Sequence, residues 1–260
     1  MTGRPSVPHR LSARNELSCR DQLPGDNCGV RIAGSKSWRF EHDDLDILRR
    51  ALFVRDAAML SVAASVEVPP RLSGDVPMTT AVVSEGDRAV AARQWLLWWR
   101  HMLDQVAQEF IARKAEDPSD GLEDPRDVMA RLEARTRWRH EVCDPPGFAG
   151  ISAWPELQSA AVGTYSAHQA WSPGTSRWSA AEPRLFAWQI VRDAVQDAAA
   201  SLDLPVSEMD AVAHVVPVEG EWSYIAGPGC GVCSVAVALD PAAASYLLRK
   251  LFISAFPATP

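Results

Sequence analysis

The sequence predicts an α+β fold in which several helices pack around a small, mostly antiparallel sheet. Apolar residues recur at helical spacing over long segments, whereas the residues after Pro205 form short apolar runs separated by glycine. At 260 residues and 47% hydrophobic content, the chain buries a full core without a metal or a disulfide. We therefore expect residues 27–260 to form a single domain, with a subdivision near residues 145–180 as the alternative.

The N-terminal part of the chain is expected to be an arm followed by one helix. Residues 1–26 combine proline, arginine, serine and glycine without a period, which is typical of a flexible segment. The first helix is expected at about 43–64, and Pro69 and Pro70 cannot continue it because proline lacks a backbone N–H. Four apolar residues recur there at helical spacing: Leu45, Leu48, Leu52 and Met59.

A long second helix is expected at about 85–116. Ser84 and Asp87 have the three-residue spacing of a capping box, which satisfies amide groups at a helix start. Apolar residues then gather on one stripe: Ala92, Trp95, Leu96, Trp99, Met102, Leu103, Val106 and Phe110. Each such side chain contributes about 1.5–3 kcal/mol when buried. This helix is therefore expected to be the spine of the fold.

Three further helices are expected to begin at a proline, which suits the first turn because the amide there has no helical partner. Their expected ranges are about 125–142, 183–202 and 241–255. Asp124 and Asp240 directly precede two of these prolines and are suitable N-caps. Between the last two helices, residues 211–239 are expected to form a β-meander of three strands. The expected strands are Ala211–Val218, Trp222–Ala226 and Val232–Leu239.

Charge and composition argue against several classes of partner. The formal net charge of -7 makes general binding to nucleic acid unfavourable, because that binding depends on clustered positive charge. No apolar run reaches the roughly 18 residues of a membrane-spanning helix, and the first residues have no apolar signal region. Five cysteines in 260 residues do not form a disulfide framework. We therefore expect a cytoplasmic protein that does not bind membranes.

The segment 131–140 concentrates positive charge and is considered as a candidate phosphate or nucleic-acid site. Its arginines surround a tryptophan, a combination that can clamp a phosphate or stack on a base. The residues concerned are Arg131, Arg135, Arg137, Trp138 and Arg139. The favoured interpretation is a solvated helix face, because the chain is acidic and arginine is its usual cation. Contact with phosphate or nucleic acid is the alternative.

Two cysteines three residues apart, Cys230 and Cys233, lie among glycines at the start of the last strand. In a continuous strand, positions three apart face opposite sides, so the thiols would be packing material. The alternative is a tight turn at Gly229 and Gly231 that lets both sulfurs bind one ion. With His140 and Cys143 they would complete a Cys₃His shell for structural zinc.

Histidine near these thiols is the other chemical possibility in the sequence. His214 lies in an apolar strand, where a satisfied core histidine is the favoured interpretation. A catalytic base beside Cys230 or Cys233 is the alternative. No nucleophile elbow, Walker loop, dinucleotide fingerprint or zinc-protease motif is present, which argues against an enzyme.

The sequence therefore favours a non-catalytic protein that binds another protein, such as a scaffold, immunity-type or assembly component, with no cofactor. It contains ten tryptophans, and rigid indole rings suit recognition surfaces. Leu97 and Trp98 lie off the apolar stripe of the second helix, so either another layer covers them or they belong to a partner-binding surface. The expected surface residues are Leu97, Trp98, Trp154, Trp171 and Trp178. The alternative is a thiol- or zinc-dependent enzyme built around Cys230 and Cys233. The sequence sets no oligomeric state.

Overall fold

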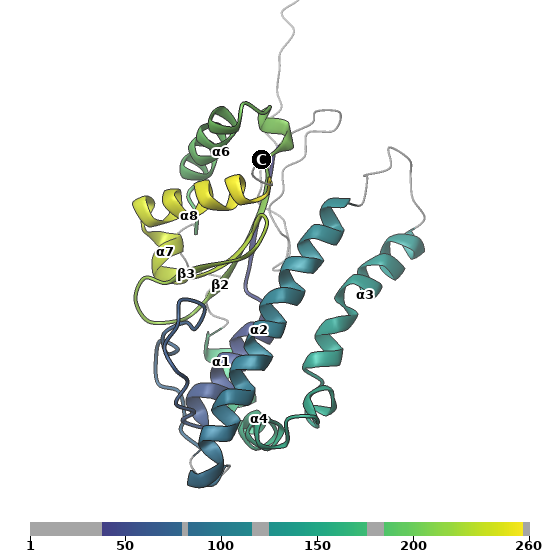
Figure 1. Cartoon of the computed structure of the whole chain (residues 1–260), viewed down its shortest axis with the longest axis vertical. Helices are drawn as coiled ribbons and strands as arrows, with labels where there is room; N and C mark the ends of the chain where they lie inside the picture. Colours follow the sequence, from purple (N-terminus) through teal and green to yellow (C-terminus); the bar gives the residue numbers. More distant parts are fainter. Residues whose placement is uncertain (1–37, 80–82, 116–124, 176–184, 257–260) are drawn as a thin grey trace, which may run out of the picture.

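The computed structural model describes residues 38–79, 83–115, 125–175 and 185–256, which contain seven helices and a four-stranded mixed sheet (Figure 1). The fold is α+β, as the sequence predicts. The strands are β1 (Arg39–Asp43), β2 (Asp210–Val216), β3 (Ser223–Gly227) and β4 (Cys230–Ser234). The helices are α1 (Asp46–Ala57), α2 (Glu85–Ala115), α3 (Pro125–Val142), α4 (Pro155–Thr175), α6 (Trp188–Leu202), α7 (Val235–Leu239) and α8 (Pro241–Ser254). Short 3₁₀ turns lie at Ala149–Ile151 and Val206–Glu208.

The sheet has the strand order β1-β2-β4-β3, and it is mixed rather than mostly antiparallel. β1 and β4 both pair with β2 in parallel, and only β3 runs antiparallel, along β4. The expected meander is wrong in this respect, because β4 lies between β2 and β3 instead of following β3 outward. The parallel arrangement brings the carboxyl ends of β1, β2 and β4 to one edge of the sheet.

Helices cover both faces of the sheet (Figure 1). One face packs against α1, α2 and α4 through Val212, Val216 and Val232. The other face packs against α6, α7 and α8 through alternating residues such as Ala213 and Val215. The period of two along β2 separates these two sets, as a strand buried on both faces requires.

The starts of α2 and α8 follow the expected capping residues, whereas α6 begins at Trp188 and not at the expected residue 183. The long helix begins after Ser84, whose Oγ accepts from the Asp87 amide at 3.2 Å. Asp240 caps α8 by accepting from the amides of Ala242 and Ala243. The expectation for α3 is confirmed at both ends, whereas α1 is shorter than the expected 43–64. It ends at Ala57 because Met59 adopts a positive φ of 54°.

The last expected strand is also shorter than predicted. β4 ends at Ser234, and the next five residues form the helix α7 instead of continuing to Leu239. Ser234 caps this helix, since its Oγ accepts from the Val237 amide at 3.3 Å. The expected arm at 1–26 lies outside the described residues. Within the described ranges, no helix has both the length and the apolar character needed to cross a membrane.

Candidate functional site

The two cysteines of β4 lie on opposite faces of the sheet. Cys230 belongs to the core under α1 and α2, whereas Cys233 belongs to the core under α6 and α8. Both are completely buried, and burial raises the pKa of the Cys233 thiol to about 12. This arrangement contradicts a shared metal site at Cys230 and Cys233, because their sulfurs face different cores.

The glycines around Cys230 have a packing role. Gly229 has a φ of 71°, and a Cβ added there would lie 2.6 Å from Phe110 Cε1. A Cβ at Gly227 would lie 2.6 Å from Ala107 Cβ. These two glycines therefore let α2 approach the β3–β4 turn closely, which larger residues would prevent.

The other two residues of the expected zinc shell, His140 and Cys143, do not complete a metal site with Cys230 and Cys233. Cys143, after α3, is buried, and Arg50 Nη1 donates to its Sγ at 3.4 Å. Burial raises the pKa of this thiol, although the charge of Arg50 opposes the change. His140 is exposed. Within the described part of the chain, no three His, Cys, Asp or Glu side chains are grouped to hold a metal.

The tryptophans of α2 are core residues. Trp95, Trp98 and Trp99 are fully buried. Each indole donates to a backbone carbonyl: Trp95 to Ala51 at 2.7 Å, Trp98 to Val142 at 3.0 Å and Trp99 to Glu67 at 2.7 Å. Trp98 is therefore wrong as a surface residue, because the end of α3 covers it. The side chain of Leu97 next to it is 51% exposed.

The other expected surface tryptophans do not form one patch in the described structure. Trp154 and Trp171 are partly buried and pack against the core between α1, α2 and α4. Trp178 lies outside the described residues. Sequence reasoning missed an exposed aromatic contact between Trp38 and Trp188. Their ring centroids are 4.8 Å apart, and Trp188 is 57% exposed.

The arginine-rich segment is partly occupied by contacts with α2. Glu109 accepts from the Trp138 indole at 2.8 Å and from Arg139 at 2.7 Å. Arg135 lies 4.0 Å from the same carboxylate, and Trp138 is buried. Arg131 and Arg137 are exposed. Arg135, Trp138 and Arg139 are thus engaged in holding α3 against α2, which leaves less of this segment for a phosphate.

The most unusual charged contact links β1 and β2. Asp43 Oδ1 and His214 Nδ1 form a hydrogen-bonded ion pair, and His214 is buried. Burial alone lowers the pKa of His214, but Asp43, with a smaller contribution from Cys230, raises it to about 10. The ring is therefore an imidazolium at neutral pH and cannot accept a proton as a general base. Sequence reasoning considered His214 but missed Asp43.

A small cavity lies beside this ion pair, at the carboxyl ends of β1 and β2. It has a volume of about 80 Å³. We call it the edge cavity; its lining residues are His42, Asp43, Asp44, Arg49, Leu185, Val215, Pro217 and Val235. Arg49 is buried and donates to Asp46 at 2.7 Å as well as to Asp44. The edge cavity is therefore lined by both charged and apolar side chains.

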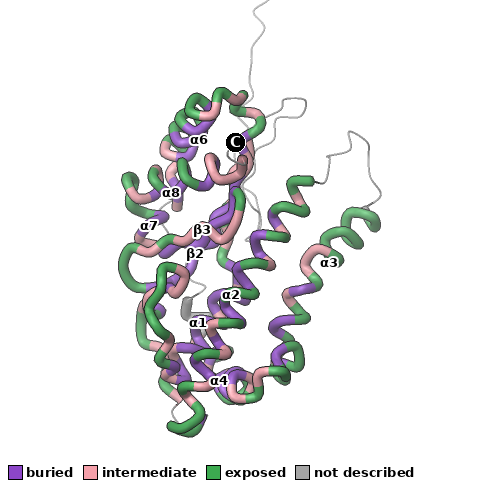
Figure 2. The backbone as a smooth tube through the Cα atoms, viewed as in Figure 1, coloured by how far each residue is buried: buried purple, intermediate pink, exposed green. Residues whose placement is uncertain are grey.

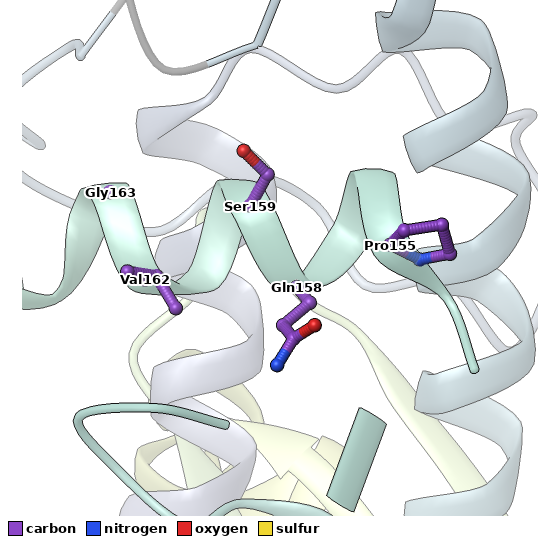
Figure 3. Close-up of a pocket in the computed structure, with 5 residues that line it drawn as sticks. All are labelled: Pro155, Gln158, Ser159, Val162 and Gly163. Atoms are coloured by element: carbon purple, nitrogen blue, oxygen red, sulfur yellow. The ribbon is translucent and has the colours of Figure 1, made fainter. Parts of the chain in front are cut away.

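Two other features lie on α4. A shallow hollow of about 430 Å³ lies along α4, and its five lining residues, from Pro155 to Gly163, include no charged side chain (Figure 3). His168, also on α4, is 2% exposed and packs edge-on against Phe53. Neither ring nitrogen of His168 has a hydrogen-bond partner in the described structure, and burial lowers its pKa to about 4.

Comparison of the chain with protein-family models, curated proteins and solved structures finds no match.

Proposed function

We propose that the protein is a non-catalytic binding protein that holds another protein on the exposed surface of α3. The observation that carries this proposal is the exposure of the amino-terminal half of α3: residues 126–134 are all exposed (Figure 2). In Figure 1, α3 is also the outermost helix, with α2 between it and the sheet. A helix in water gains most of its stability from packing, so an unpacked half suits docking.

Three apolar side chains lie on this half of α3, and we call them the α3 stripe: Val128, Met129 and Leu132. They are 44%, 52% and 40% exposed. At about 100° per residue, they fall within an arc of roughly 100° on the helix surface. Exposed apolar side chains gathered in this way favour a protein contact over simple solvation.

The charge around the α3 stripe favours an acidic partner. The helix contains five arginines against three acidic residues, in a chain whose net charge is -7. Two of them, Arg135 and Arg139, face Glu109 of α2, and the other three are exposed. A second copy of the protein would bring like charges together, which is unfavourable. An amphipathic segment with acidic flanks would place apolar residues on the stripe and carboxylates beside the arginines.

A cytoplasmic site of action remains part of this proposal. The described cysteines, Cys143, Cys230 and Cys233, are all free thiols, which supports a reducing compartment. The role would be that of a scaffold, immunity-type or assembly component.

The test compares proteins retained by the wild type with those retained by the double variant M129E/L132E, in lysate of the producing cells. V162E is the matched control, because Val162 is 46% exposed on α4. A partner with an acidic amphipathic segment should bind the wild type and V162E, and its binding should weaken with salt. Light scattering should find a monomer. Equal retention by all three proteins, or a dimer that M129E/L132E abolishes, would contradict the proposal.

A second candidate is a thiol-dependent enzyme that uses Cys230. The observation that favours it is the nearness of Cys230 to His214, whose pKa it helps to raise, with His214 itself held by Asp43. The complete burial of Cys230 weighs against it, because a nucleophile must reach its substrate. Iodoacetamide should label native Cys230 within minutes at pH 7 if it is a nucleophile. It should label Cys230 only after unfolding if the thiol is a core residue.

A further inference from the structure

We draw no further inference here: the strongest candidate, the surface patch formed by the stacked rings of Trp38 and Trp188 beside the starts of β1 and α6, carries nothing because nothing among the described residues shows what covers it.

Discussion

His214 and Asp43 lie directly opposite each other on neighbouring parallel strands and form an ion pair in which His214 is buried and Asp43 partly exposed, although 171 positions separate them in the chain. Asp43 is the last residue of β1, and His214 lies within β2. The charge and hydrogen bond of His214, together with the charge of Arg139, overcome the effect of burial and hold the pKa of Asp43 below its ordinary value. The pair therefore fixes the edge strand β1 to the sheet by a charged contact.

Removing one charge of this pair should destabilise the fold strongly. Asp43→Asn should lower the free energy of unfolding by about 3–5 kcal/mol, because the charge attraction of the pair is lost and the buried His214 ring must then release its proton. Urea unfolding at pH 7 measures this. Asp193→Asn is the control, since Asp193 pairs with Arg192 at the exposed surface of α6 and should cost under about 1 kcal/mol. Similar losses for the two variants would show that the pair of Asp43 with His214 contributes no more to stability than an exposed ion pair.

The same pair should make stability depend on pH on the alkaline side. The pKa of His214 is raised from 6.5 to about 10 in the folded state, so its stabilising contribution is complete below pH 6.5 and is lost as pH rises toward 10. Urea unfolding between pH 6.5 and 8.5 should show this decline before Cys233, with its pKa of about 12, adds a loss above pH 9. Asp43→Asn should show a flatter profile. Parallel profiles would assign the decline to other groups.

His168 should produce the opposite dependence in acid. Its pKa is lowered from 6.5 to about 4 by burial, so the neutral ring is favoured and stability falls as pH decreases from 6.5 toward 4. His168→Phe should retain the contact with Phe53, remove two unpaired buried nitrogens and reduce this acid sensitivity. The control is His101→Gln, because His101 is exposed on α2. An unchanged acid profile in His168→Phe would rule out His168 as the cause.

Two adjacent residues of α2 should respond very differently to truncation. Trp98→Ala should cost about 3–5 kcal/mol, because it leaves a large cavity and an unpaired carbonyl at Val142. Leu97→Ala should change stability by less than about 0.5 kcal/mol, since half of that side chain is exposed. Thermal and urea unfolding measure both variants. Comparable losses would contradict the burial that separates these neighbours.

Local signals predicted most of the helices, while the pairing of the strands was not readable from the sequence. A first-turn proline is a local signal, so the start of α3 is readable from Pro125. Strand order depends on contacts between distant segments, such as Asp43 with His214. The sequence of two turns after β2 favoured antiparallel neighbours, but β4 pairs in parallel with β2 instead.

The candidate site residues also divide into those that a local pattern predicts and those that depend on contacts between distant segments. The period of two in a strand correctly separated Cys230 from Cys233, because it is a local property. The single apolar stripe expected for α2 left open whether another layer covers Trp98, and in the structure α1, α3 and α4 all pack around this helix. A helix enclosed by several neighbours buries more than one face, and no local pattern reveals its neighbours. Asp43 gave no such local signal, because it stands at the start of the helix expected at about 43–64.

The α3 stripe is tested most directly by cross-linking from defined positions. A photoreactive amino acid replaces Met129 in one protein and Val162 in a second, and both are irradiated in the producing cells. The photoreactive residue at position 129 should cross-link to an acidic amphipathic segment of one specific protein. This cross-link should disappear when the same protein also carries Leu132→Glu. Position 162 should not capture it. The same adducts from both positions, or none from position 129, would contradict a binding role for α3.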